Sequence, residues 1–486
     1  MKSRWTEEGG YRQLLVVAIP LILSTAAWSI QHFVDRMFLS WYSPEAIAAA
    51  TPAGVLNFSL MSLFIGTAGY ASTFVAQYYG AKRYQRIGPV IWQGVYISVL
   101  GGGVLLFFIP FARPLFDLVG HDPLVRGHEV AYFQVLCLGG GPVIASSAMA
   151  GFFAGRGRTW PVMWVNAMAT AVNIVLDYAL VFGNWGFPEL GIKGAGIATA
   201  LSGIFSFLAY AVLILHISRG KNYYILKGWR PEKRLFWRLL RFGFPSGVQF
   251  FLDMAGFSIF ILLVGRLGTT NLAATNIAFN ISTLAFMPMI GCGMAVTVLV
   301  GQYLGKNRPD LAQKSAYSGF HVTFLYMAGI AAAYVSFPEI FVAPFAARAD
   351  PENFNEISAL TIILLRFVAV YSLFDTMNII FASAIKGAGD TRYVMFMIVI
   401  ISSLVLVIPT YVAIVVLDKG IVIAWILISI YAIVLGIAFY CRFLGGKWKA
   451  MRVIERASMP LPPECVGRVD AGWFSQEVTG KIIPED

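Results

Sequence analysis

Two stretches of this sequence are copies of one another. The first, GTAGYASTFVAQYYGAKR, begins at Gly66, and the second, GCGMAVTVLVGQYLGKNR, begins at Gly291, 225 residues later. Each is an apolar run that ends in Gln-x-x-Gly and then meets basic residues, as a membrane span does where it reaches the cytosol. At the same offset, Pro20 corresponds to Pro245. We therefore expect two similar membrane-embedded halves, an organisation typical of transporters.

Composition independently indicates a membrane protein. Hydrophobic residues make up 58% of the chain and charged residues 13%, whereas a soluble domain has roughly 25% charged residues. About 20 apolar residues cross the hydrocarbon core as a helix, and the sequence has twelve such runs. We expect an all-α membrane protein with twelve transmembrane helices in two pseudo-symmetric six-helix lobes around a central cavity. The expected spans are 13–39, 47–77, 89–111, 128–153, 160–183, 194–217, 240–267, 271–303, 317–342, 358–385, 391–417 and 420–444.

Basic residues predict the orientation of these spans. The loops that face the cytosol if the N-terminus is inside hold 28 of the 36 Lys and Arg residues, and the opposite loops hold six. By the positive-inside rule, both termini are expected to be cytosolic. We also expect the protein to lie in the inner cell membrane. The basic segment between the halves marks the lobe boundary. The predicted units are an N-terminal lobe (1–218), a cytosolic inter-lobe loop (219–239), a C-terminal lobe (240–444) and a loosely ordered cytosolic tail (445–486).

Several other classes of protein are not indicated. The net charge of +11 is spread over loops, and no nucleic-acid-binding module is visible. The basic loop between the halves is expected to touch anionic membrane lipid instead. The four cysteines have no paired spacing, so neither a disulfide framework nor a zinc site is predicted. We expect a monomer without a cofactor.

Four carboxylates lie within or near the ends of spans, namely Asp35, Asp177, Asp253 and Asp375. An ionised carboxylate at mid-membrane costs about 2.5 to 3.5 kcal/mol, so four exposed to lipid would cost on the order of 10 kcal/mol. They are therefore expected to face protein or water and to serve a function.

A polar side chain lies one helical turn from each of these acids, on the same face. The pairs are His32 with Asp35, Asn173 with Asp177, Gln249 with Asp253 and Asn378 with Asp375. Asn276 and Asn280 repeat the spacing on the eighth span without an acid. Such amides either help to bind a cation or only join helices by hydrogen bonds. A structural salt bridge from Asp253 to Arg366 is a further alternative.

Aromatic residues offer contacts for a flat organic cation. Trp28 lies two turns before Asp35 and is a candidate pocket residue. Packing between helices and the aromatic belts at the membrane surface are the alternative explanation for most such side chains.

The ordered set of motifs resembles the multidrug and toxic compound extrusion (MATE) family. The resemblance extends over all twelve spans and rests on Pro20 and Asp35, Gln77-x-x-Gly80-Ala81, Asn173-x-x-x-Asp177, Gly191-x-x-Gly194-Ala195, Pro245 and Asp253, Gln302-x-x-Gly305, and Asp375 with Gly387-x-Gly389-x-Thr391. It implies two six-helix lobes around a V-shaped cavity and the export of organic cations in exchange for H+ or Na+.

The resemblance also assigns roles to residues. Asp35, Asn173 and Asp177 match the cation-coupling positions of the N-terminal lobe. Asp253 and Asp375 match the acidic positions of the C-terminal lobe, where we place a substrate or second cation site that also includes Gln249, Asn280 and Trp28. The chain departs from the family at Ile385-Lys386-Gly387, where relatives often have Leu-Arg-Gly, and at Asp253, where Glu is common. His32 has no role that the resemblance supplies.

The expected mechanism is competition at buried carboxylates. Removal from water favours the neutral form of a carboxyl group, so a proton can displace a bound organic cation. Na+ is the other candidate, since Asp35, Asn173 and Asp177 supply the hard oxygen ligands that it prefers. A lipid-linked oligosaccharide flippase of related fold is the alternative, although its anionic substrate would favour basic residues in the cavity. No enzyme activity is expected, because no acid, base or metal ligands converge in a recognisable motif.

Overall fold

The computed structural model describes residues 2–118, 121–218, 223–346 and 351–455, and this part of the chain is helical without strands. Twelve helical segments are long and apolar enough to cross a membrane, which confirms the predicted fold class. They are Tyr11–Tyr42, Pro44–Gly80, Tyr84–Phe108, Pro123–Ala154, Trp160–Phe182, Ile192–Ser218, Lys233–Gly265, Thr269–Gly305, Pro309–Ser336, Phe354–Ala388, Thr391–Val416 and Ile421–Leu444. Most of the predicted tail, residues 456–486, lies outside the described residues.

The N-terminal half of the sequence forms the helices α1 to α9. These are α1 (Lys2–Thr6), α2 (Tyr11–Tyr42), α3 (Pro44–Gly69), α4 (Ala71–Gly80), α5 (Ile87–Phe108), α6 (Ala112–Asp117), α7 (Pro123–Ala154), α8 (Trp160–Phe182) and α9 (Ile192–Ser218). Helices α3 and α4 continue one another and together form the second span. Helix α7 packs against α3, α5 and α9, and α8 packs against α2 and α9.

The C-terminal half forms the helices α10 to α17. These are α10 (Lys233–Gly265), α11 (Thr269–Gly305), α12 (Pro309–Ser336), α13 (Pro338–Ala346), α14 (Pro351–Ala388), α15 (Thr391–Ile401), α16 (Ile408–Tyr411) and α17 (Ile421–Leu444). The eleventh span also contains two π-helical segments, η4 (Ser402–Val407) and η5 (Val412–Val416). Helix α14 packs against α11, α12 and α17.

One predicted boundary differs from the structure for a reason visible in the sequence. The ninth apolar run was expected over 317–342, but α12 is Pro309–Ser336 and a new helix, α13, begins at Pro338. Proline is favourable at the first position of a helix, as at Pro309. Inside a helix it removes a backbone hydrogen bond and kinks or breaks the helix, and at Pro338 the run is broken: α12 ends at Ser336 and α13 begins at Pro338.

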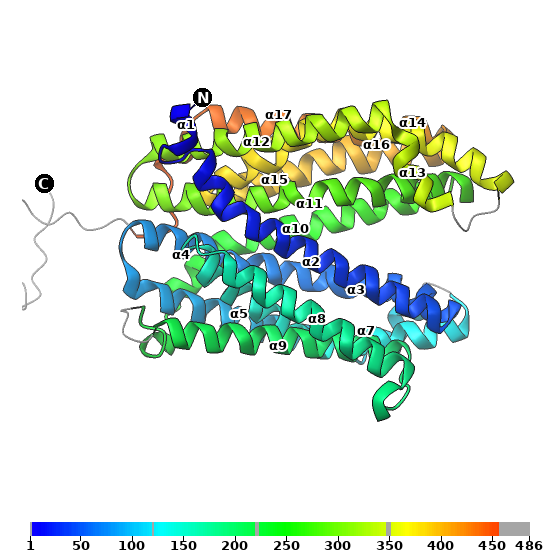
Figure 1. Ribbon diagram of the computed structural model, residues 1–486, viewed down its shortest axis with the longest axis horizontal. Coiled ribbons are helices and arrows are strands. Elements are labelled where there is room, and N and C mark those ends of the chain that lie inside the picture. Colours follow the sequence, from blue (N-terminus) through cyan, green and yellow to red (C-terminus); the bar gives the residue numbers. More distant parts are fainter. Residues whose placement is uncertain (1, 119–120, 219–222, 347–350, 456–486) are drawn as a thin grey trace, which may run out of the picture. The chain divides into compact units, whose positions relative to one another are not determined.

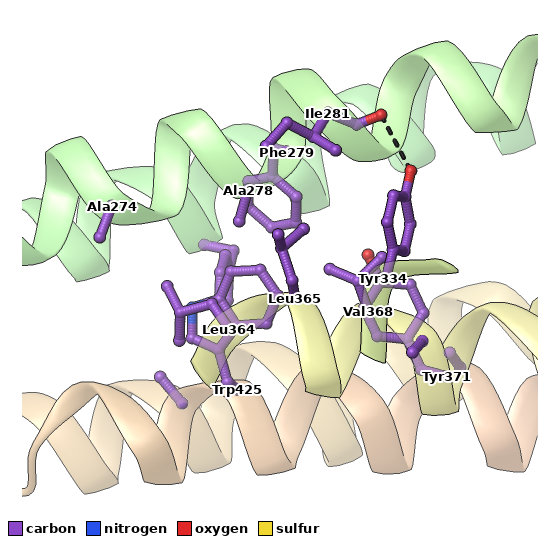
Figure 2. Packing of buried hydrophobic residues seen from close by; sticks show 14 of the residues in the cluster. Ala274, Ala278, Phe279, Ile281, Tyr334, Leu364, Leu365, Val368, Tyr371 and Trp425 are labelled. Atoms are coloured by element: carbon purple, nitrogen blue, oxygen red, sulfur yellow. Dashed lines mark hydrogen bonds between the residues drawn. The ribbon is translucent and has the colours of Figure 1, made fainter. Parts of the chain in front are cut away.

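A cluster of buried apolar side chains holds the C-terminal half together. Figure 2 shows Phe279 of α11 against Trp425 of α17, with Leu364, Leu365 and Val368 of α14 beside them. The Phe279 and Trp425 rings are stacked with their centroids 5.0 Å apart. The Tyr334 hydroxyl of α12 donates a hydrogen bond of 3.2 Å to the Ile281 carbonyl oxygen. Apolar and ring contacts therefore tie α11, α12, α14 and α17 into one bundle.

Helices α2 and α10 each contact both halves of the sequence (Figure 1). The first part of α2 packs against the C-terminal half, where the Tyr303 hydroxyl of α11 donates to the Gln13 side-chain oxygen at 2.5 Å. Its later part packs against α8 of its own half. The first part of α10 likewise packs against α3 of the N-terminal half, and its later part packs against α11. Pro20 and Pro245, which the internal repeat pairs, lie in these two helices.

Contacts between the halves are found from one end of the molecule to its middle. This holds for the hydrogen bonds and ring contacts of the described residues. We call this the basic end, because the loops there hold most of the described Lys and Arg residues; in Figure 1 it lies on the left. The contacts reach as far as Thr25, whose hydroxyl lies 3.4 Å from the Met287 carbonyl oxygen, and the Phe58–Phe250 ring pair. The halves are thus joined at the basic end.

Candidate functional site

Two acids of the N-terminal half come together from separate helices. Asp35 lies in α2 and Asp177 in α8; the former is 6% exposed and the latter is fully buried. Their carboxyl groups are close enough to interact with each other. Asn173, one turn before Asp177 on α8, is also fully buried. The structure therefore brings Asp35 and Asp177 together, with Asn173 one helical turn from Asp177 on α8.

The oxygen atoms of this group are short of hydrogen-bond donors. One oxygen of Asp35, both oxygens of Asp177 and the amide oxygen of Asn173 are buried and accept no hydrogen bond. The Asn173 amide nitrogen instead donates to the Thr199 hydroxyl of α9 at 3.5 Å. Adjacent negative charges out of water repel one another, and a buried acceptor without a partner is costly. An arrangement of this kind fits a bound proton or cation.

The chemistry of these donors fits a small hard cation as well as it fits a proton. Two carboxylates and an amide offer only oxygen ligands, which suit Na+ better than they suit a soft transition metal. No group of three or more His, Cys, Asp or Glu side chains that would hold a metal ion occurs in the described part of the chain. Asp35, Asn173 and Asp177 are thus the residues that would hold Na+.

Tyr132 belongs to the same group but could not be recognised in the sequence. It lies in α7, is 8% exposed, and interacts electrostatically with both Asp35 and Asp177. A single tyrosine in an apolar span carries no periodic signal, because most aromatic residues in such spans pack against other helices or the membrane surface. Only the packing of α7 shows that Tyr132 lies near the two acids.

The two acids of the C-terminal half are arranged differently. Asp253 lies in α10 and Asp375 in α14, and the two carboxyl groups interact. The Asn378 amide nitrogen donates to Asp375 at 2.7 Å, and the Gln249 amide nitrogen donates to Asp253 at 3.4 Å. Both helix-turn pairings predicted in this half are therefore formed.

A lysine rather than an arginine accompanies Asp253. Lys386, in the last turn of α14, interacts electrostatically with the Asp253 carboxylate. Arg366 is exposed, and no ion pair between Arg366 and Asp253 occurs among the described residues. The competing salt bridge proposed from the sequence is thus not formed. Tyr431 of α17 interacts with both acids and was also not recognisable from the sequence.

A row of aromatic rings connects the two halves. Trp28 of α2 is 42% exposed and packs against His32 at 4.7 Å and Phe58 of α3 at 5.4 Å between ring centroids. Phe58 in turn meets Phe250 of α10 at 5.7 Å. His32 is exposed and lies edge-on to Trp28, so it adds a polar edge to this surface. The row offers ring faces to a flat cation.

Asn280 lies apart from these contacts. Its side chain is exposed, and its amide nitrogen donates to the Asn276 carbonyl oxygen one turn earlier at 2.8 Å. No hydrogen bond to Asp253 or Asp375 involves it among the described residues. Its side-chain hydrogen bond stays within its own helix.

Comparison with known families decides what kind of protein carries this arrangement. The MatE family model matches residues 20–179 and 245–412. The two matched stretches begin at Pro20 and Pro245, which are the prolines that the internal repeat pairs. The chain belongs to the MATE family. It is therefore an integral membrane protein of a family of transporters, not of enzymes.

Relatives and solved structures agree with membership of the MATE family. The chain is 30% identical to a probable multidrug resistance protein NorM of Xanthomonas campestris pv. campestris, over 79% of this chain and 82% of the relative. It is 28% identical to multidrug resistance protein PmpM of Pseudomonas aeruginosa, over 79% of this chain and 80% of that protein. A MOP superfamily transporter from Pyrococcus furiosus has the same fold, with a TM-score of 0.82 at 19% identity, over 90% of this chain and 96% of the other.

Proposed function

We propose that this MATE-family protein exports organic cations and drives their exit by the entry of H+ or Na+. The observation that carries the proposal is the group of buried acceptors at Asp35, Asn173 and Asp177, which have no hydrogen-bond partner. A proton or Na+ from outside would satisfy these oxygens. A multidrug function is supported by the relatives, two of which are named multidrug resistance proteins.

In the proposed cycle, one conformation is open to the outside and the other to the cytosol. The joined basic end is the closed gate of the outward-facing state, and we place it, with the N-terminus, in the cytosol of a cell with the protein in its inner membrane. The positive-inside rule supports this orientation. Binding of the coupling ion at Asp35 and Asp177 weakens the hold on the cationic substrate, which then leaves on the outer side.

The substrate would lie between the two acidic groups. The aromatic row from Trp28 through Phe58 to Phe250 connects the halves at mid-depth. The ring faces attract organic cations, and Asp253 and Asp375 supply negative charge on the far side of the row. A single chain contains both groups, so we propose that a monomer transports.

Flux measurements in vesicles test the proposal. Purified protein is placed in liposomes with a cationic, a neutral or an anionic dye, and an inward gradient of H+ or of Na+ is imposed separately. We expect gradient-driven efflux of the cationic dyes, and its loss in Asp177→Asn. Asp310→Asn is the matched control, because Asp310 is an exposed acid at the basic end. Preferred export of anionic dyes would contradict the proposal and favour a flippase of related fold.

A further inference from the structure

The two copies of the internal repeat meet each other at the basic end. Gln77 lies in the last turn of α4, and its amide nitrogen donates to the Gly387 carbonyl oxygen of the C-terminal half at 3.0 Å. Gln302 lies in the last turn of α11, and its amide nitrogen donates to the Gly155 carbonyl oxygen of the N-terminal half at 2.8 Å. Each half therefore contributes one donor and one acceptor to a reciprocal pair of bonds.

Glycines allow this close approach. A Cβ atom added to Gly80 would collide with the carbonyl group of Gln302, and one added to Gly305 would collide with that of Gln77. The Gln-x-x-Gly spacing of the repeat thus places a donor side chain and a bare backbone on one face of each helix, one turn apart. Helices α4 and α11 cross with their backbones in contact.

Because they are buried, these hydrogen bonds are either fully formed or fully replaced by bonds to water. Gln77 is fully buried and Gln302 is partly buried. A buried amide that loses its partner without gaining water costs about 1 to 3 kcal/mol. The bonds are complete when the halves are joined, and they are replaced by water only after the helices separate, so intermediate separations are unfavourable.

The chain that follows α17 makes the Gln77 and Gln302 hydrogen bonds differ from each other. The Gln77 amide oxygen accepts a hydrogen bond of 2.8 Å from the Val453 backbone nitrogen, in the chain that follows α17. Among the described residues, no hydrogen bond to the Gln302 amide oxygen is recorded. We call residues 446–453 the C-terminal strap. It packs on its own half, because Trp448 is fully buried and stacks on Phe443 of α17 at 4.9 Å.

The far end of the strap, at Val453, is also packed against the C-terminal half. Val453 is 1% exposed and lies beside Gly389, whose φ of +112° suits glycine alone. Gly387, the acceptor for Gln77, is in the same Gly-x-Gly motif. One glutamine side chain therefore joins a backbone carbonyl of the opposite half to a backbone nitrogen of the strap.

We propose that Gln77 and Gln302 form the latch of the gate at the basic end, and that the C-terminal strap strengthens the latch on the Gln77 side only. The inference rests on the proposed alternating access. Because the strap is anchored on the C-terminal half, opening the gate breaks its bond to Gln77 and leaves its other contacts in place. The strap therefore biases the protein toward the state that is closed at the basic end.

Distances between spin labels measure the state of the gate without any substrate or ion gradient. One pair of labels replaces the exposed residues Arg158 and Lys306 at the basic end, and a second pair replaces the exposed residues Glu45 and Thr269 at the outer end. Cys441 and Cys465 are changed to serine beforehand. Opening of the gate lengthens the first distance and shortens the second.

Four variants separate the contributions of the latch and the strap. Gln77→Met and Gln302→Met keep the side-chain size and remove the bonds. Val453→Pro removes the backbone donor of the strap, and a chain that ends at Met451 removes the same contact in a second way. Gln85→Met is the matched control, since Gln85 is exposed at the same end.

We expect each latch variant to raise the ratio of open to closed molecules by roughly two- to tenfold, the equivalent of one hydrogen bond. Gln77→Met should have the larger effect, and Val453→Pro should add little to it, because both changes remove the same strap bond. Gln85→Met should leave the distances unchanged.

Two results would overturn the inference. Unchanged distances in both glutamine variants would show that Gln77 and Gln302 do not form the latch. An unchanged ratio of open to closed molecules in Val453→Pro and in the shortened chain would show that the strap does not strengthen the latch. If Gln77→Met does not fold, the Gln302 and strap variants still test the proposed latch. Because the assay needs no transport, a shift in distance without ion-driven efflux would contradict only the proposed function.

Discussion

The acidic groups of the two halves differ in how their carboxylate oxygens are paired. In the N-terminal half, both oxygens of Asp177 and one of Asp35 are buried without a hydrogen-bond partner, and Arg36, the residue after Asp35, interacts electrostatically with Asp35. In the C-terminal half, Asp375 accepts from Asn378, Asp253 accepts from Gln249, and Lys386 lies near Asp253. Buried carboxylate oxygens without donors gain most from a bound proton or ion, whereas amide donors already satisfy part of this need in the C-terminal half. We propose that the two groups therefore have different tasks in transport.

The largest expected effect comes from the half whose carboxylate oxygens lack hydrogen-bond donors. Asp177→Asn and Asp35→Asn each remove one of the two charges that would attract the coupling ion. Loss of a buried carboxylate that pairs with a bound cation costs about 2 to 5 kcal/mol, so ion-driven efflux should fall by roughly thirtyfold or more. Initial rates of dye efflux under an imposed gradient provide the measurement. Wild-type rates in both variants would remove this group from coupling.

A smaller loss is expected for the C-terminal half, whose acids accept hydrogen bonds from amides. Asp253→Asn and Asp375→Asn leave neighbouring amides and Lys386 in place, and the remaining acid still attracts a cation. We expect the concentration of cationic dye for half-maximal efflux to rise by roughly tenfold, about 1.4 kcal/mol, with efflux still driven by the ion gradient. Complete uncoupling in these variants, as in Asp177→Asn, would mean that the halves are equivalent.

The effect of removing Lys386 has the opposite sign. Lys386→Met deletes the internal cation beside Asp253, so a cationic dye meets less competition there. A partly exposed charge pair is worth about 1 kcal/mol or less, and dye affinity should increase by about two- to fivefold. Equilibrium dye binding in detergent gives the value. Weaker binding after this change would show that Lys386 supports the site structurally and does not compete with substrate.

The smallest loss of affinity concerns the aromatic row. Trp28→Ala removes one ring face at an exposed site, worth about 0.5 to 1 kcal/mol to a bound cation, so the affinity for flat cationic dyes should fall by roughly two- to fivefold. Neutral dyes of similar shape should lose less. Asn280→Ala is the control and should stay within about twofold, since its amide bonds only to its own helix. Equal losses for cationic and neutral dyes would argue for shape alone.

Much of the fold could be predicted because the membrane restricts it so strongly. Backbone polar groups in hydrocarbon must bond within a helix, so apolar runs translate directly into spans, as twelve of them do here. The exception at the ninth span came from Pro338, which ends one helix and starts another. The helix-turn pairs at Asp253 and Asp375 were predictable for a similar reason, because spacing along one helix requires no tertiary information.

The sequence by itself determined the twelve spans, the duplication, the family and the positions of the four acids. All of these follow from local composition, helical spacing or repeated motifs. Only the tertiary structure decided that Asp35 meets Asp177 while Asn173 turns to Thr199, that Tyr132 and Tyr431 join the acids, and that Lys386 rather than Arg366 interacts electrostatically with Asp253. It alone also revealed the reciprocal hydrogen bonds from Gln77 to Gly387 and from Gln302 to Gly155. These contacts join residues far apart in the chain, and helix packing sets such distances, which no local pattern records.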